Sequence, residues 1–216
     1  MSIPDSASKP PHDTLTPITA ALVEFLAEAR VPTEHGSFTM KLFRENSTGL
    51  EHVAMVMGDV VGSALVRVHS ECMTGDVFGS LRCDCGPQLN FAMNAIGKKG
   101  SGVVVYLRQE GRGIGLANKL RAYQLQDQGM DTVEANQHLG FAADLRNFDV
   151  AAQILDHLGV SSVKLMTNNP RKVDTLSAHG VNIEERVPVQ CDVQPENERY
   201  LDTKARKMGH HIDWLG

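Results

Sequence analysis

The sequence predicts an α/β fold, a mixed sheet flanked by helices, with an antiparallel N-terminal portion and a loop rich in cysteine. In the second half of the chain, apolar segments of strand length alternate with amphipathic segments of helical length, which is typical of an α/β layer. In the first half, strand-like segments follow one another with only turn-forming sequences between them, which favours an antiparallel meander. A chain of 216 residues is long enough to bury a core of its own.

The N-terminal third contains a tail, a helix and three strands in this interpretation. Residues 1–16 are rich in Ser, Pro and Asp, and we expect them to form a mobile tail. The segment ITAALVEFLAEAR, residues 18–30, has apolar residues at helical spacing and carries Glu24 and Glu28, so it predicts an amphipathic docking helix. Strands are expected at 37–43, 51–57 and 63–70, separated by the turn-prone sequences ENSTG and GDVVG.

The remaining elements alternate between helix and strand. After the cysteine loop, PQLNFAMNAIGKKG predicts a helix that stops at Gly100. GVVVYLR, residues 102–108, predicts a buried strand, and residues 115–129 predict a helix that ends at a glycine. Helix, strand, short helix and strand are then expected at 148–159, 162–167, 171–180 and 181–189.

Composition and charge exclude several classes of protein. A net charge of −5 gives no general attraction to nucleic acid or to an anionic membrane, so any anion site must be built locally. No apolar run approaches the roughly 20 residues that a membrane helix needs. The N-terminal sequence lacks the cationic and apolar regions of a secretory signal. We therefore expect a cytoplasmic protein with no nucleic-acid or membrane partner.

Three of the four cysteines lie within fourteen residues. Cys72, Cys83 and Cys85 are spaced C-x10-C-x-C, and Cys191 lies far from them. Three thiolates can hold Zn²⁺ and leave the fourth tetrahedral position open, so this segment is the predicted zinc-binding loop. Two alternatives are three thiols buried as small apolar groups, and His69 as a fourth ligand that closes a structural site. The charged flanking residues favour the metal over buried thiols.

Two loops that follow strong strands carry features of an anion site. RQEGRGIG, residues 108–115, has two arginines, three glycines and a helix start, and TNNPRK, residues 167–172, has two adjacent cations at another helix start. Ligands collect at the carboxyl ends of strands in such sheets, and helix starts suit phosphate. A tight turn and ordinary helix capping are the alternatives. FAADLRNF, residues 141–148, places Asp144 and Arg146 either in a site or in a surface ion pair.

Taken together, these motifs resemble the GTP cyclohydrolase II family. The resemblance is carried by RVHSEC…SLRCDCG, RQEGRGIGL, LMTNNPRKV and NERYLDTKARKMGH, and it runs from about residue 31 to about residue 210 with compatible spacing. It implies the stand-alone form of a family that is often fused to a dihydroxybutanone-phosphate synthase domain. Residues 17–216 are then expected to be a single GTP cyclohydrolase II catalytic domain.

The resemblance implies the first reaction of riboflavin biosynthesis. GTP loses pyrophosphate, its imidazole ring opens, and C8 leaves as formate. The product is 2,5-diamino-6-ribosylamino-4(3H)-pyrimidinone 5′-phosphate. The resemblance also implies one Zn²⁺ per subunit, Mg²⁺ with the triphosphate, and a homodimer.

The family's functional residues map onto matching positions of this sequence. The three clustered cysteines match the zinc ligands, Asp144 the general base, Arg146 the residue assigned to attack at the α-phosphate, and Tyr123 a tyrosine associated with the ring chemistry. Cys191 matches no family role. Positions that match nucleotide contacts are Arg67, Val68, His69, Ser70, Glu71, Gln88, Glu110, Gly111, Arg112, Thr132, Thr167 and Lys172.

Elementary chemistry leaves some of these assignments open. A guanidinium stays protonated in proteins, so Arg146 suits a clamp on the α-phosphate better than a nucleophile. A single carboxylate can accept both N1–H and N2–H₂ of guanine, and either Glu71 or Glu110 is a candidate. The alternative functions are a related purine-nucleotide hydrolase that stops at the formamide or uses another base, and a non-catalytic zinc-stabilised nucleotide-binding module.

Overall fold

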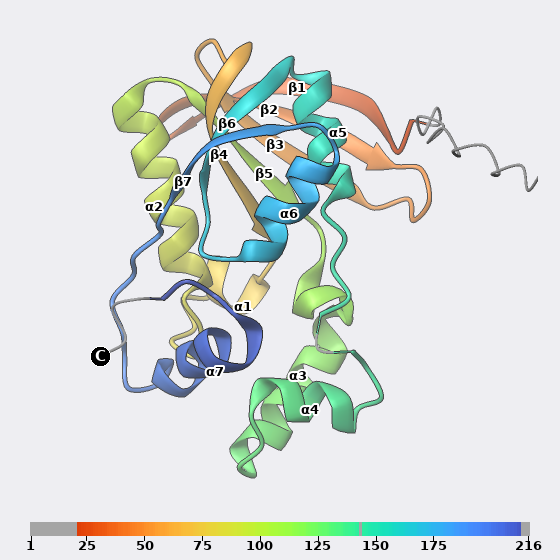
Figure 1. Ribbon diagram of the computed structural model, residues 1–216, viewed down its shortest axis with the longest axis vertical. Helices are drawn as coiled ribbons and strands as arrows, with labels where there is room; N and C mark the ends of the chain where they lie inside the picture. The colour runs from red at the N-terminus through yellow and green to blue at the C-terminus, as the bar shows by residue number, and fades with distance from the viewer. Residues whose placement is uncertain (1–20, 143, 213–216) are drawn as a thin grey trace, which may run out of the picture.

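The computed structural model describes residues 21–142 and 144–212, so the tail expected at 1–16 lies outside the described residues (Figure 1). The described strands form one mixed sheet with the order β1-β2-β3-β5-β4-β6-β7. Helices cover both faces of this sheet, which confirms the predicted fold class.

The N-terminal part of the sheet is antiparallel, as predicted. β1 (Val23–Thr33), β2 (Gly36–Glu45) and β3 (Glu51–Met57) form a meander, and β3 then pairs antiparallel with β5 (Gly102–Leu107). The helix expected over 18–30 is wrong within the described residues, because the chain from Val23 onward is strand β1.

A register shift explains why β1 resembles a helix in sequence. The shift lies between Phe25 and Ala27, and it interrupts the alternation of side chains that marks a strand. The hairpin to β2 is held by Thr33, whose Oγ1 donates to the Gly36 carbonyl at 2.9 Å and accepts from His35 N at 3.1 Å. Pairing with β2 therefore outweighs the helical propensity of the segment.

The other half of the sheet is parallel. β4 (Gly62–Ser70) pairs parallel with both β5 and β6 (Val160–Met166), and β7 (Asn182–Val187) pairs parallel with β6. The expectation that residues 63–70 belong to the antiparallel meander is therefore wrong. Val66 and Val68 are fully buried in β4, which suits a central strand covered on both faces.

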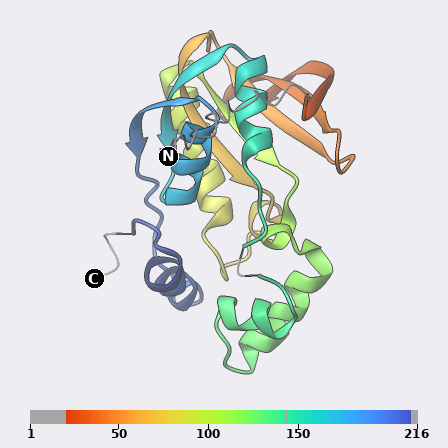
Figure 2. The same ribbon diagram turned by 45° about the vertical axis from the view of Figure 1, so that its right-hand side comes forward.

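Helices pack on both faces of the sheet and form two apolar cores. α2 (Cys85–Lys99) covers one face, where Ala92 and Ile96 pack with Phe38 and Val104. α5 (Asp149–His157) and α6 (Pro170–Ala178) cover the other face (Figure 2). The helices and strands expected from residue 85 to residue 189 are confirmed to within a few residues at each end.

A second group of short elements lies beyond the carboxyl ends of the parallel strands. Figure 2 shows α7 on one side of this end and the α3–α4 pair on the other. The elements are α1 (Met73–Asp76), the 3₁₀ helix η1 (Glu110–Gly113), α3 (Gly115–Asp127), α4 (Thr132–His138) and α7 (Glu198–Met208). Of these, only α3 was expected from sequence. Over the described ranges, every helix is too short or too polar to cross a bilayer.

Candidate active site

A pocket of about 1020 Å³, counting space open to solvent, lies at the carboxyl ends of β4, β5 and β6. This is where ligands bind in open α/β sheets. Every residue that sequence reasoning assigned to the site lines the pocket, except Val68 and Asp144. Val68 and Asp144 contact residues that line the pocket. The Val68 carbonyl accepts a hydrogen bond from Lys172 Nζ at 2.6 Å, and the Asp144 carboxylate accepts one from Arg146 Nε. The fold therefore gathers the predicted residues into one place.

At one side of the pocket, three sulfur atoms converge. The Sγ atoms of Cys72, Cys83 and Cys85 all lie within 4.8 Å of one another, and those of Cys72 and Cys83 are 3.7 Å apart. Zinc–sulfur bonds of about 2.3 Å in tetrahedral geometry place ligand sulfurs roughly 3.8 Å apart. The donor set and its spacing therefore fit a single zinc ion.

Two glycines make this convergence possible. A Cβ on Gly75 would lie 2.8 Å from Cys83 Sγ and 3.2 Å from Cys72 Sγ, and a Cβ on Gly86 would lie 2.3 Å from the Gly75 carbonyl. Neither glycine has a positive φ, so the loop needs glycine for room and not for backbone conformation.

The surroundings of the sulfurs argue against simple apolar burial. Lys119 Nζ donates to Cys72 Sγ at 3.0 Å, and Thr74 Oγ1 lies 3.6 Å from the same sulfur. Hydrogen bonds from the Cys83 and Cys85 thiols, with a further contribution from Lys119, lower the pKa of Cys72. Polar groups that favour a thiolate are expected around metal-binding cysteines.

His69 lies outside the sulfur cluster and is held by a buried carboxylate. Its Nε2 lies 3.0 Å from Asp76 Oδ1, and its ring stacks on Tyr106 at 5.5 Å between centroids. The Asp76 carboxylate also accepts from Cys72 N at 2.9 Å and from the Tyr106 hydroxyl at 2.8 Å. His69 Nδ1 is buried and has no partner among the described residues. Burial lowers the pKa of His69, so a neutral ring with Nδ1 as acceptor faces the pocket.

The two candidate glutamates differ in how their oxygens are used. Glu110 Oε2 accepts from Met73 N at 2.7 Å, and its Oε1 accepts from Gly111 N at 2.7 Å and from Lys119 Nζ at 2.8 Å. Glu71 Oε2 accepts from Arg108 Nε at 2.9 Å, and its Oε1 accepts no hydrogen bond from any described residue. Only Glu71 therefore keeps a carboxylate oxygen for a ligand.

The loop after β5 is strained. Gly111 and Arg112 follow one another with φ of 62° and 61°, in the left-handed region that residues with a Cβ rarely adopt. Arg112 NH1 is buried without a partner among the described residues, and the Arg112 guanidinium lies 5.8 Å from the centre of the Tyr200 ring. Strain of this kind collects at functional sites, and here it presents an arginine to the pocket.

Asp144 and Arg146 form a buried ion pair. Of the two alternatives from the sequence, a surface ion pair is therefore wrong. Arg146 Nε and NH2 donate to the two Asp144 oxygens at 2.9 and 2.8 Å, and the Asp144 side chain is 4% exposed. Arg171 NH1 reaches the same carboxylate at 3.0 Å. Burial raises the pKa of Asp144, but the hydrogen bonds and charge of Arg146 outweigh this and lower it to about 2. Arg146 also lies 5.5 Å from the Phe148 ring centre.

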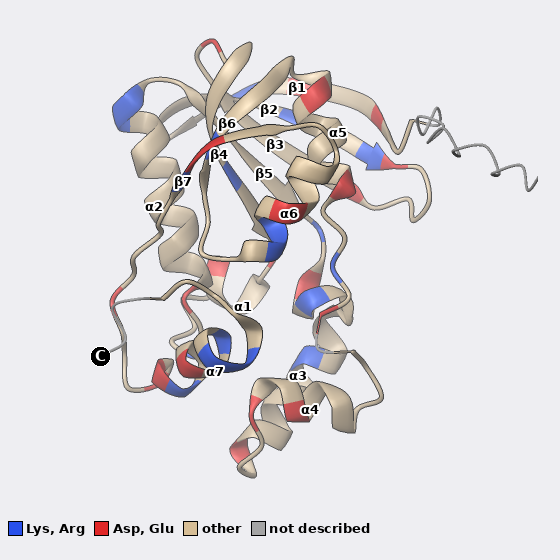
Figure 3. Cartoon of the chain, viewed as in Figure 1, with Lys and Arg blue, Asp and Glu red and all other residues tan. Residues whose placement is uncertain are grey.

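Other buried cations line the same pocket. Arg67 NH1 donates to the Met166 carbonyl at 2.9 Å, while its Nε is buried without a partner among the described residues. Lys172 is 4% exposed, and burial together with the charges of Arg67 and Arg146 lowers its pKa well below the ordinary value. Figure 3 shows Lys and Arg on α6, η1, α3 and α7 around this end of the sheet. Cations crowded in this way favour binding of a polyanion.

Sequence reasoning assigned no role to several residues that the structure places in or beside the pocket. Lys119 on α3, Tyr200 and Lys204 on α7, and His210 line it, and Asp76 supports His69. The capping box of Asp131 and Glu134 at the start of α4 is a local signal that predicts that helix. Nothing in the sequence distinguishes Lys119 and Lys204 from exposed lysines, and they are buried only through tertiary packing.

An α/β protein with a three-cysteine cluster and a cationic cradle in one pocket has the features of a metal-assisted enzyme acting on an anionic substrate. The family model for GTP cyclohydrolase II matches residues 24–188, and the chain belongs to this family. This finding confirms the family that the sequence motifs resemble.

Individual relatives agree with the family match. The chain is 59% identical over 187 residues to GTP cyclohydrolase-2 of Cronobacter sakazakii, covering 86% of this chain and 95% of that protein. It is 56% identical over 195 residues to GTP cyclohydrolase-2 of Azotobacter vinelandii, covering 89% and 94%. It is 57% identical over 192 residues to riboflavin biosynthesis protein RibBA of Bacillus subtilis, covering 88% of this chain but 48% of that protein.

The chain thus spans about half the length of RibBA and nearly the whole length of the other two relatives. Among solved structures, it is similar to RibBX, a two-domain 3,4-dihydroxy-2-butanone 4-phosphate synthase from A. baumannii. The two are 26% identical with a TM-score of 0.41, over 81% of this chain and 42% of that one.

Replacing Gly75 by Ala should disturb the sulfur cluster, because the added Cβ would lie 2.8 Å from Cys83 Sγ. We expect zinc affinity to fall about 10-fold to 100-fold, as it does when the groups supporting metal ligands are lost. Competition with a chromogenic chelator measures this. Gly79→Ala is the control: it strains a positive φ, but its Cβ meets nothing within 4 Å. Equal zinc affinity in both variants would contradict the packing argument.

The Asp144 carboxylate should stabilise the fold only above acidic pH. Its folded pKa of about 2 lies below the ordinary 3.8, so the ionised form contributes about 2 kcal/mol that is lost as pH falls from about 4 toward 2. The difference in unfolding free energy between the wild type and Asp144→Asn should be constant from about pH 8 to pH 5 and shrink below about pH 4. Urea denaturation at each pH measures it, and a difference that stays constant down to about pH 3 would refute the assignment.

Proposed function

We propose that this chain catalyses the zinc-dependent hydrolysis of GTP, releasing formate and pyrophosphate and yielding 2,5-diamino-6-ribosylamino-4(3H)-pyrimidinone 5′-phosphate. The observation that carries the proposal is that the three sulfurs and the buried cations line the same pocket. The base can therefore lie at the sulfurs while the phosphates lie among the cations.

The sulfur side of the pocket suits the ring-opening steps. Cys72, Cys83 and Cys85 would hold Zn²⁺, which makes a water molecule nucleophilic near neutral pH when it is bound. Tyr123 lies beside this cluster, since its hydroxyl is 3.3 Å from Thr74 Oγ1, and Thr74 in turn contacts Cys72. Burial raises the pKa of Tyr123, so its hydroxyl is protonated at neutral pH. We assign it to donating a proton to the ring or to the leaving nitrogen during the reaction.

The cationic side suits loss of pyrophosphate. Arg146 donates two hydrogen bonds to Asp144, which fixes its guanidinium plane before substrate arrives. Burial lowers the pKa of Arg146, but the Asp144 carboxylate outweighs this and raises it, so the group stays charged. We assign Arg146 to clamping the α-phosphate and Asp144 to orienting it, because a carboxylate with a pKa of about 2 is a weak base.

Recognition of guanine is assigned to Glu71. Its unshared Oε1 lies on the strand end next to Cys72, whereas both oxygens of Glu110 bond to the protein. A carboxylate accepting from N1–H and N2–H₂ rejects adenine, whose corresponding edge places an acceptor opposite the acid. Glu110 is assigned to holding η1 against α1.

Membership of the family supports the remaining parts of the proposal. We propose Mg²⁺ with the triphosphate, one Zn²⁺ per subunit, and a homodimeric cytoplasmic enzyme whose chain forms a single catalytic domain. The proposal is tested by incubating the protein with GTP and Mg²⁺ and measuring formate, pyrophosphate and bound zinc together. Pyrophosphate without formate would indicate an enzyme that stops at the formamide, and binding without either product would indicate a non-catalytic module.

Replacing Cys83 by Ser should separate the two steps. With one sulfur ligand lost, we expect zinc to be released and formate formation to fall below about 1% of the wild-type rate. Release of pyrophosphate should continue, because the cations are untouched. Cys191→Ser is the matched control, since Cys191 lies outside the sulfur cluster. Formate at the normal rate from the Cys83 variant would rule out the metal-dependent mechanism.

Replacing Arg146 by Lys should reduce both products. Lysine cannot reproduce the two-point contact with Asp144, and loss of a preorganised cation at a phosphoryl centre typically costs about 100-fold to 1,000-fold in rate. Arg206→Lys is the control, because that side chain is 80% exposed on α7. Turnover is measured as pyrophosphate per minute. Wild-type rates in the Arg146 variant would remove this residue from the mechanism.

A further inference from the structure

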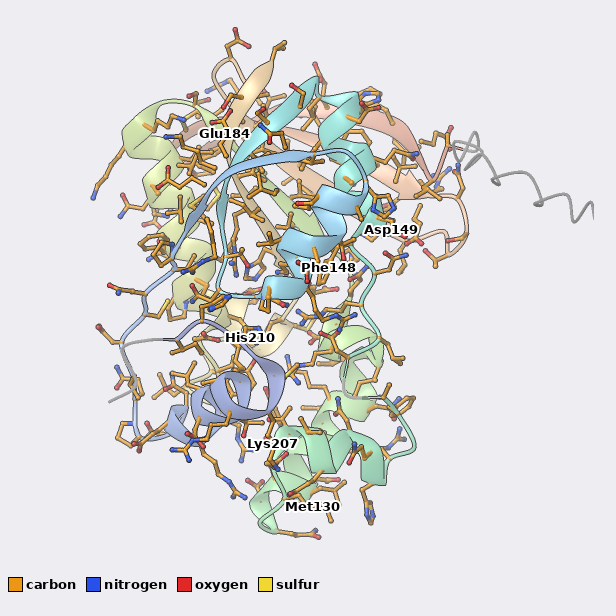
Figure 4. The ribbon with its side chains drawn as sticks, viewed as in Figure 1. Met130, Phe148, Asp149, Glu184, Lys207 and His210 are labelled. Carbon is orange, nitrogen blue, oxygen red and sulfur yellow. The ribbon has the colours of Figure 1, made fainter. Side chains whose placement is uncertain are left out.

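The C-terminal helix α7 belongs to the pocket, although the family match ends at residue 188. Tyr200 and Lys204 on this helix, and His210 just after it, line the same pocket as the sulfurs and the arginines. Figure 4 shows His210 and Lys207 in the part of the chain that faces the carboxyl end of the sheet. A segment outside the matched range therefore supplies part of the candidate site.

Lys204 is buried against a single carboxylate. Its Nζ donates to the two Asp84 oxygens at 2.7 and 3.0 Å, and the two residues are 7% and 3% exposed. Nζ also lies 4.9 Å from the centre of the Tyr200 ring. Two contacts this short between an ammonium group and a carboxylate make the pair ionic.

Asp84 connects Lys204 through hydrogen bonds to Arg67, one of the buried cations of the pocket. Its Oδ2 accepts from Gln88 Nε2 at 2.5 Å, and Gln88 Oε1 accepts from Arg67 NH2 at 2.5 Å. All three residues are less than 9% exposed. A continuous buried path of hydrogen bonds therefore runs from Lys204 on α7 through α2 to Arg67 on β4. Arg67 Nε, buried and without a partner among the described residues, is the donor left for a ligand.

The far side of α7 is anchored separately. Lys207 pairs with Asp131 and with Glu134 at the start of α4, and Arg199 donates to the Gly129 carbonyl. These contacts hold the helix against the α3–α4 side of the pocket. The helix therefore keeps its position when Lys204 alone is changed, so the effect of Lys204 can be measured by itself.

Resting on the proposed function, we infer that Lys204 is a positioning residue for GTP. By neutralising Asp84, it keeps Gln88 and the Arg67 guanidinium in the orientation that binds a phosphate. Without Lys204, the Asp84 carboxylate would be buried and unpaired, and it would draw Gln88 and Arg67 toward itself or admit water. The consequence is weaker binding of the nucleotide, with the sulfur cluster left intact.

The test compares Lys204→Met with Arg206→Met, an exposed cation on the same helix whose partner is Asp202. We expect the KM for GTP to rise about 10-fold to 100-fold in Lys204→Met, with kcat changed far less and zinc content as in the wild type. Arg206→Met should match the wild type. Circular dichroism checks the fold, and if Lys204→Met is unfolded, Lys204→Gln carries the same test.

A double variant distinguishes a positioning role of Lys204 from direct contact with GTP and from a general loss of protein stability. Asp84→Asn combined with Lys204→Met leaves no unpaired carboxylate at position 84, and the Asn oxygen still accepts from Gln88. We expect it to recover most of the KM lost in the single variant. An unchanged KM in Lys204→Met, a loss that the double variant does not recover, or a loss of zinc would each overturn the inference. A wild-type protein that releases no pyrophosphate from GTP would instead contradict the proposed function.

Discussion

The arrangement of the pocket follows from the burial of positive charge at the carboxyl ends of β4 and β6. Arg67, Arg146, Lys172 and Lys204 are removed from water within one pocket of a chain whose net charge is −5. Asp84 and Asp144 neutralise two of them, and backbone carbonyls hold the others. The cations that no carboxylate neutralises favour an anionic ligand at this site.

The sulfur cluster depends on close packing instead of charge pairing. α1 and the first turn of α2 approach so closely that only glycine fits at positions 75 and 86. Lys119 joins this corner to the strained η1 loop, because it contacts both Cys72 and Glu110. Asp84, between two of the cysteines, joins the same corner to Arg67 through Gln88. Hydrogen bonds therefore connect the sulfur cluster to the buried cations, which suits a substrate that contacts both.

Most of the fold was predictable because its elements carry strong local signals. From residue 85 to residue 189, the expected strands and glycine-ended helices are confirmed, and η1 and α4 are the elements in this range that were not expected. Two errors have tertiary causes. β1 resembles a helix because a register shift interrupts its alternation, and β4 joins the parallel half because it is buried on both faces. Neither fact is local, since strand pairing joins residues far apart in the chain. α7 went unpredicted because its inward residues include Thr203 and Lys204 beside Leu201, and polar side chains do not mark a buried face.

Residue types and their spacing were enough to identify the family, the three cysteines and the cationic loops. The use of each group could be read only from the folded structure. It showed that both Glu110 oxygens accept hydrogen bonds from the protein, whereas Glu71 Oε1 accepts none from the described residues. It also showed that Asp144 and Arg146 form a buried pair, and that His69 contacts Asp76 instead of the sulfurs. Hydrogen-bond partners, burial and pKa depend on neighbours that the fold brings together from distant positions, and spacing along the chain does not encode them.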